Sequence, residues 1–326
     1  MTEGSVSYQL EPGEAVATGL RRCAGEQLDS TIRELTEGLR TEPVKAVHGA
    51  RKSLKKERSL LRLGRGALDT DQRRIEMSTF RDAGRKLGGA RDADVMIQAL
   101  DDVAERYVGQ VPQATFAALR ERLGLQREAA RVALVDSPAT REVVEELKAA
   151  RLRIENWSPR RGGWPAISGG LLRSYRRGRK AFERARAQPT SENLHDWRKR
   201  AKDLWYHLRL LEAMAPLTMH AHAGEAHRLS DLLGDDHDLS VLAAAVGGVA
   251  GEVPADVDPV LGLIDHRRDE LQREAFFLGR RLYAEKPKAF MRRVKRYWRA
   301  WRAGTKAARS HQPTELAQVT RSAAAC

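Results

Sequence analysis

Cysteine is almost absent from this 326-residue chain, since Cys23 and Cys326 stand near opposite ends. Two such residues cannot build a disulfide framework or a thiolate zinc cluster within one chain, so the sequence fits a reducing compartment. Aromatic residues make up only 6%. The residues that favour strands are outnumbered by Ala, Leu, Arg and Glu, and no apolar alternation runs long enough to indicate a sheet. The composition predicts an all-α protein.

Long apolar runs and export signals are also lacking. The longest weakly apolar run, residues 241–251, is far shorter than the roughly 20 residues that span a bilayer. The N-terminus shows no basic segment followed by an apolar core, which a secretory signal requires. We therefore expect a soluble, bacterial-type cytoplasmic protein without a membrane partner.

The usual signatures of catalysis and metal binding are missing. The chain has no Gly-Lys pair for a Walker loop, no His-Glu-x-x-His and no Gly-x-Ser-x-Gly. His220, His222 and His227 lie close together in the sequence, but carboxylates at ligand spacing do not accompany them. We expect no enzymatic activity, no cofactor and no metal.

Segments of helical period alternate with Pro and Gly along the whole chain. The expected units are an N-terminal tail (1–12), a first helical repeat (13–157), a linker (158–169), a second helical repeat (170–309) and a C-terminal tail (310–326). The expected helices cover 13–40, 43–68, 71–87, 92–107, 113–135, 139–156, 170–187, 190–215, 217–233, 238–250, 257–283 and 287–309.

The two halves resemble each other in sequence. The segment Val47-His48-x-x-Arg51-Lys52 recurs as Leu194-His195-x-x-Arg198-Lys199, and two further matches follow in the same order at nearly the same offset. Ordered matches at one offset indicate an internal duplication. We expect two pseudo-symmetric helical bundles whose equivalent faces meet at a central groove.

Positive charge is concentrated in a few segments. Lys and Arg total 58 against 44 Asp and Glu, which gives a formal charge of +14. Residues 45–65 hold eight basic and one acidic residue, residues 171–209 twelve and four, and residues 280–309 twelve and one. Such segregation predicts a polyanionic partner.

Within these segments the basic residues fall on single helical faces, because they recur every three or four positions. Like charges at this spacing destabilise a helix by roughly 0.2–0.5 kcal/mol per pair, so an external anion is the expected partner. The alternative is that these side chains lie along the bundle surface and pair with acidic residues of neighbouring helices. The candidate binding residues are His48, Arg51, Lys52, Lys55, Lys56 and Arg62; Arg173, Arg176, Arg177 and Lys180; His195, Arg198, Lys199, Lys202 and Arg209; and Lys288, Arg292, Lys295 and Arg299.

The duplicated His-x-x-Arg-Lys-x-x-Lys motif, each copy followed by a Gly-x-x-(Arg/His)-Asp segment, resembles the CHAD family, the conserved histidine α-helical domain. The resemblance runs from about residue 13 to 309. It implies helical bundles around a basic groove or pore that binds inorganic polyphosphate, in proteins associated with polyphosphate granules. The Glu-x-Glu-x-Lys signature of the triphosphatase fused to some members is absent, so we expect a stand-alone module. His237 and Ser240 replace Arg91 and Asp94 in the second copy, so the halves are expected to contribute unequally.

Two other functional classes fit the same charge. A nucleic-acid-binding or nucleoid-associated protein also needs basic helices, and a helical scaffold could recruit acidic protein partners. A polyphosphate-binding protein should release DNA to excess polyphosphate far more readily than it releases polyphosphate to DNA, and a scaffold should bind neither at physiological salt.

Individual residues leave further alternatives. His48 and His195 either donate hydrogen bonds to phosphate or fix the bundle register. Asp92 and Asp238 follow Gly-containing breaks and are interpreted as helix N-caps. Trp197, Trp205, Tyr206, Trp298 and Trp301 are assigned to packing in preference to base stacking.

Overall fold

The computed structural model describes residues 8–88, 90–135 and 138–310, and helices make up most of these ranges. No β-strand occurs in them, and a single isolated bridge pairs Leu68 with Pro159. The predicted all-α class is confirmed. Within the same ranges, no helix combines the length and the apolar character needed to cross a bilayer.

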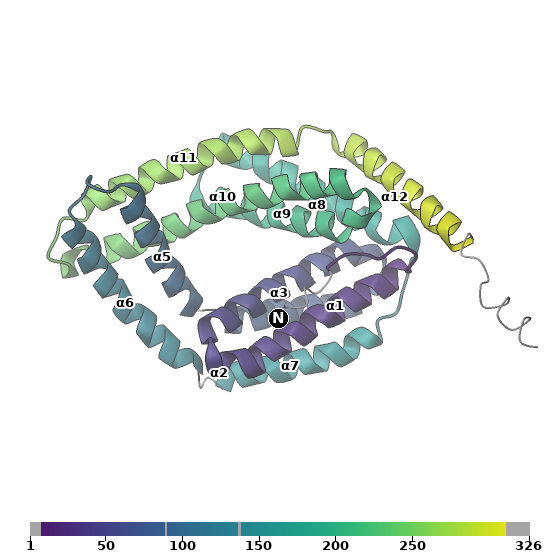
Figure 1. The fold of residues 1–326 in the computed structure, drawn as a ribbon, viewed down its shortest axis with the longest axis horizontal. Helices are drawn as coiled ribbons and strands as arrows, with labels where there is room; N and C mark the ends of the chain where they lie inside the picture. Colours follow the sequence, from purple (N-terminus) through teal and green to yellow (C-terminus); the bar gives the residue numbers. More distant parts are fainter. Residues whose placement is uncertain (1–7, 89, 136–137, 311–326) are drawn as a thin grey trace, which may run out of the picture.

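The first half of the chain forms a bundle from which two helices extend. Figure 1 shows α1, α3 and α7 running side by side, while α5 and α6 leave this bundle and reach the second half. The elements in chain order are α1 (Val16–Arg33), the π-helical η1 (Glu34–Gly38), α2 (Leu39–Thr41), α3 (Pro43–Leu63), η2 (Gly64–Gly66), α4 (Thr70–Lys86), α5 (Ala90–Arg106), α6 (Gln113–Val135) and α7 (Pro138–Glu155).

The second half contains longer helices. α9 packs against both α8 and α10, and α10 packs against α11 (Figure 1). The elements are α8 (Gly163–Ala187), α9 (Ser191–Leu210), η3 (Glu212–Met214), α10 (Pro216–Gly248), η4 (Ala250–Glu252), α11 (Asp258–Leu282) and α12 (Pro287–Ser310).

Three details of the chain differ from the expected organisation or add to it. The separate helices 217–233 and 238–250 form one continuous helix, α10, and Gly234 is buried inside it. The linker 158–169 is shorter than expected, since α8 already begins at Gly163. The N-terminal tail 1–12 is packed at its end: Tyr8 and Leu10 are buried, and Leu10 N donates a hydrogen bond to Leu210 O over 2.9 Å.

A shared core holds the two halves together. Buried apolar residues from both halves form one contiguous cluster, and α3 packs against both α8 and α9. Gly170 permits the close approach of α8, because a Cβ atom there would collide with the backbone carbonyls of Arg62 and Leu63. The cationic faces of α3, α8 and α9 are thereby brought within reach of one another.

Candidate functional site: two adjoining cationic cavities

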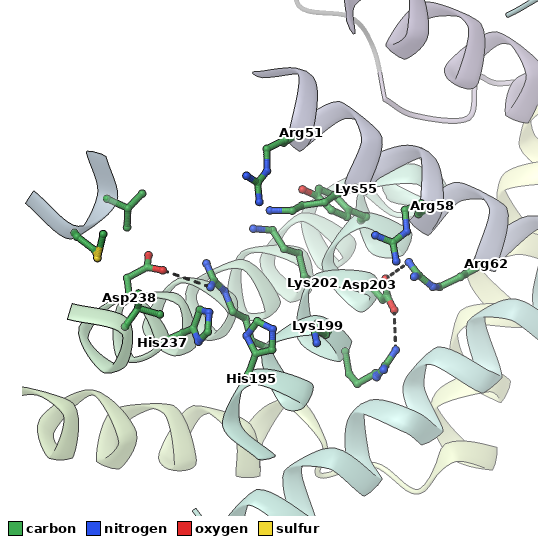
Figure 2. Close-up of a pocket in the computed structure, with 16 residues that line it drawn as sticks. Arg51, Lys55, Arg58, Arg62, His195, Lys199, Lys202, Asp203, His237 and Asp238 are labelled. Carbon is green, nitrogen blue, oxygen red and sulfur yellow. Dashed lines mark hydrogen bonds and ion pairs between the residues drawn. The ribbon is translucent and has the colours of Figure 1, made fainter. Parts of the chain in front are cut away.

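The first cavity lies between the two halves and has a volume of about 600 Å³. Its walls come from α3, α5, α9 and α10, and residues from both aligned basic motifs line it. Figure 2 shows Arg51 and Lys55 of α3 pointing toward the same space as Lys202 of α9. The basic lining residues are Arg51, Lys55, Arg58 and Arg62 from α3, and Arg198, Lys199, Arg200 and Lys202 from α9.

The second cavity lies between α8 and α9 and has a volume of about 960 Å³. It shares His195, Lys199 and Arg200 with the first cavity, so the two adjoin along α9. Besides these it is lined by six further cations, Arg65, Arg173, Arg176, Arg177, Lys180 and Arg184.

The basic faces are held in place by the apolar faces of the same helices. On α9, Leu194, Trp197 and Leu204 are buried, which turns Arg198 and Lys202 outward into the first cavity. Gly234 of α10 gives Arg198 room, because a Cβ atom there would lie 2.9 Å from the Arg198 Nη2 atom. The helical spacing seen in the sequence therefore becomes a wall of cations.

Asp203 joins the cations of the two halves. Its carboxylate lies 2.9 Å from Arg62 Nη1 on α3 and 3.6 Å from Arg200 Nη1 on its own helix (Figure 2). The Asp203 side chain is only 11% exposed. Asp238 lies 3.8 Å from Arg198 Nη1 at the other side of the first cavity. Both aspartates are thus engaged with cavity arginines.

Burial and neighbouring cations lower the pKa of two arginines that line the cavities. Burial, together with the neighbouring Arg62, lowers the pKa of Arg58. Burial, together with Arg200, lowers the pKa of Arg177 in the second cavity. An anion entering either cavity would relieve this mutual repulsion.

Two histidines from different helices lie together in the first cavity. The rings of His195 and His237 are 4.1 Å apart between centroids. Burial lowers the pKa of His195 to about 4, with a further contribution from His237. The pKa of His237 is also lowered, mainly by burial. Burial therefore favours the neutral form of the His195 ring in the protein without ligand.

Other predicted residues lie outside both cavities. His48 and Lys52 are exposed on α3, and Arg209 is half-buried near the end of α9. Lys56 donates a hydrogen bond to Gln27 Oε1 over 2.9 Å and lies over the Tyr8 ring, and burial lowers its pKa to about 8. The fourth group, Lys288, Arg292, Lys295 and Arg299, lies on α12, and none of these four described residues lines either cavity.

The capping interpretation of the two aspartates is wrong. Asp238 lies inside α10, and Asp92 falls in the first turn of α5, which already starts at Ala90. The side chains of Asp92 and Arg91 lie outside the described residues. The packing role of Trp197, Trp205, Tyr206 and Trp298 is confirmed, because all four are buried, and Trp301 is partly buried against the same core.

Sequence reasoning missed several cavity residues. Arg58, Arg65, Arg200 and Asp203 were not predicted, whereas Arg184 continues the predicted cationic face of α8. Arg58 and Arg65 continue the α3 face of Arg51, Lys55 and Arg62 at helical spacing, so the pattern could have included them. In the parts of the chain that the structure describes, no group of three or more His, Cys, Asp or Glu is arranged to hold a metal ion.

The fold and the cavities define a helical protein with a strongly cationic site, and comparison with known proteins identifies its family. The model of the CHAD domain matches residues 22–247, so the chain belongs to the CHAD domain family. No curated protein matches it in sequence.

Two solved structures share the fold. PptA from Streptomyces chartreusis is 16% identical, with a TM-score of 0.56, and the match covers 83% of this chain and 100% of that one. The CHAD domain from the plant Ricinus communis is 18% identical, with a TM-score of 0.58, and the match covers 86% and 96%.

Proposed function

We propose that the two adjoining cavities bind linear inorganic polyphosphate without cleaving it. The observation that carries the proposal is the charge of the lining: eight Lys and Arg in the first cavity and six more in the second, against four carboxylates in all. A chain of phosphates offers charge-assisted hydrogen bonds to each of these cations in turn. Membership in the CHAD family supports the same ligand.

The size of the first cavity favours a thin polymer over duplex nucleic acid. This cavity has a volume of about 600 Å³ and is walled by four helices, α3, α5, α9 and α10. A thin chain of phosphates can meet the cations of α3 and α9 together, whereas a duplex, whose major groove alone is about 12 Å wide, presents its phosphates only on its outer surface. The cations that line its walls therefore suit a narrow chain.

The lining also argues against single-stranded nucleic acid, which binds by stacking its bases on aromatic rings. Among the described residues that line the cavities, Tyr206 is the only aromatic residue besides His195 and His237. Tyr206 is itself buried and stacks on Trp205. A ligand without bases suits this surface better.

The contacts of the acidic side chains in the first cavity support binding without hydrolysis. Asp203 and Asp238 each lie within 4 Å of an arginine, so both carboxylates are already engaged with cations of the cavity wall. We extend the proposal to a cytoplasmic protein associated with polyphosphate granules, to which this affinity would recruit it.

The test is a titration with polyphosphates of graded length, in which bound ligand and released orthophosphate are both measured. The variant is Arg176→Glu with Lys199→Glu, because both side chains are exposed and lie on the cavity walls. The matched control is Arg33→Glu with Arg40→Glu, two exposed residues that line neither cavity and change the net charge equally.

We expect the cavity variant to lose affinity by about a hundredfold or more, since each charged hydrogen bond contributes about 1.5–3 kcal/mol. The control should bind like the wild type, and helical circular dichroism should be the same for all three. Equal weakening in both variants would show that only net charge matters. Duplex DNA that displaced polyphosphate at equal phosphate concentration would favour the nucleic-acid alternative.

A further inference from the structure

The outward face of α12 carries cations that the cavities do not use. Lys288, Arg292, Lys295, Arg296 and Arg299 are exposed. None of the five forms an ion pair or hydrogen bond with any residue that the structure describes, whereas Arg293 on the same helix pairs with Glu285. From Lys288 to Arg299 the row extends about 17 Å at roughly 1.5 Å per residue.

The opposite face of α12 is fixed to the protein body. Phe290, Val294 and Trp298 are buried, and the Phe290 ring stacks on Tyr175 of α8 with centroids 4.1 Å apart. Because these apolar side chains are already packed, α12 cannot offer them to a lipid bilayer as an amphipathic membrane helix does. The available chemistry of α12 is its cationic row.

The cationic row and the second cavity face in different directions. Tyr175 marks the side of α8 that contacts α12. At about 100° per residue, Arg173, Arg177 and Lys180 project from the other side of α8, where they line the second cavity. Figure 1 shows α12 at one end of the molecule, beside α8. A short ligand in the cavities therefore cannot also contact the row on α12.

We propose that the exposed face of α12 binds a second polyphosphate chain, so that one protein molecule bridges two chains. This inference rests on the proposed function of the cavities. The ligand suits the row because closely spaced cations on a helix match the repeated charges of a linear polyanion. The row is convex and contacts its ligand from one side only, so this contact is weaker than binding in the cavities.

The test is light scattering during titration of the protein with long-chain polyphosphate at about physiological salt. A protein with two binding faces crosslinks long chains, whereas a protein with one face only coats them. The outer-face variant is Arg292→Glu, Lys295→Glu and Arg299→Glu. The matched control is Arg33→Glu, Arg40→Glu and Arg141→Glu, which changes net charge equally at exposed positions away from α12.

We expect the outer-face variant to lose most of the scattering, by about tenfold or more, while the control scatters like the wild type. Affinity for chains just long enough to fill the cavities should change by less than about twofold, because charges beyond a Debye length of about 8 Å are screened. Replacement of the same three residues by Gln should give the same loss without introducing repulsion.

Scattering by the outer-face variant equal to that of the control would overturn the bridging proposal while leaving the cavities' function intact. Loss of short-chain binding in this variant would also overturn it, because the row would then belong to the first site. Binding of duplex DNA or anionic vesicles that depends on the row, with unchanged polyphosphate scattering, would assign α12 to another partner. Failure of the wild type to bind short chains at all would instead refute the function of the cavities.

Discussion

Affinity for polyphosphate should fall steeply with salt, and the slope can be worked out from the cavity lining. The first cavity holds eight Lys and Arg and two aspartates, a net of six positive charges. A flexible polyanion releases about 0.7 counterion per neutralised charge, so the logarithm of affinity should fall with a slope of about −4 against the logarithm of salt. Raising the salt concentration from about 0.05 M to about 0.2 M should then lower the affinity for short chains by about 250-fold.

Longer chains should show a steeper slope. The second cavity adds six cations and two carboxylates, so a chain that fills both cavities meets about ten net charges. The slope should steepen to about −7, which corresponds to a loss of about ten-thousandfold over the same range. The assay is fluorescence anisotropy of end-labelled polyphosphates of two lengths at four or more salt concentrations. Equal slopes for the two lengths, or a slope shallower than about −2 for the longer chain, would refute the reasoning.

Three further predictions concern single residues. Asp203→Asn should lower the free energy of unfolding by about 1–3 kcal/mol in urea titrations. A fully buried ion pair would lose more, but Arg62 is 24% exposed. The same variant should steepen the slope of polyphosphate affinity against salt by about 0.7, because one negative charge is removed from the cavity. Burial holds the pKa of the Glu57 carboxyl well above its usual value, so on raising the pH the unfolded chain loses this proton before the folded protein does. The free energy of unfolding should therefore fall by about 1.4 kcal/mol per pH unit above about pH 4.5. Glu57→Gln should remove this loss, and an unchanged pH dependence of urea stability would refute it. His195→Gln should bind polyphosphate with nearly the wild-type affinity at every pH between about 8 and about 6, because burial lowers the pKa of His195 to about 4. If the affinity of the wild type rose strongly over this range as pH falls and that of the variant did not, the ligand would protonate His195.

The helical class and most helix positions could be predicted from the sequence because apolar period and Pro or Gly punctuation are local signals. The exception is the helix end that the sequence predicts near Gly234. Gly234 follows a Leu pair and precedes acidic residues, a pattern typical of a helix end, yet α10 continues through it. The glycine leaves room for the Arg198 side chain of α9, and contacts between distant helices leave no local signal.

The site was predicted as far as single helices allow. Spacing identified the face of α3 that carries Arg51 and Lys55 and the face of α9 that carries Arg198 and Lys202, and the structure brings these four residues into one cavity. Spacing could not show that α12 packs on the far side of α8, because its pattern of cations is as regular as the others. Nor could it show that Asp203 would pair with an arginine 141 residues away in the chain.

The most direct test of the central claim is a crystal structure of the protein with polyphosphate bound. The account predicts a chain of phosphates that runs through both cavities, with oxygens within hydrogen-bond distance of Arg51 and Arg198 in the first and of Arg173 or Arg177 in the second. Lys199, which lines both cavities, should contact the chain where they adjoin. Phosphates found only outside these cavities, with the lining cations still paired as they are without ligand, would contradict it.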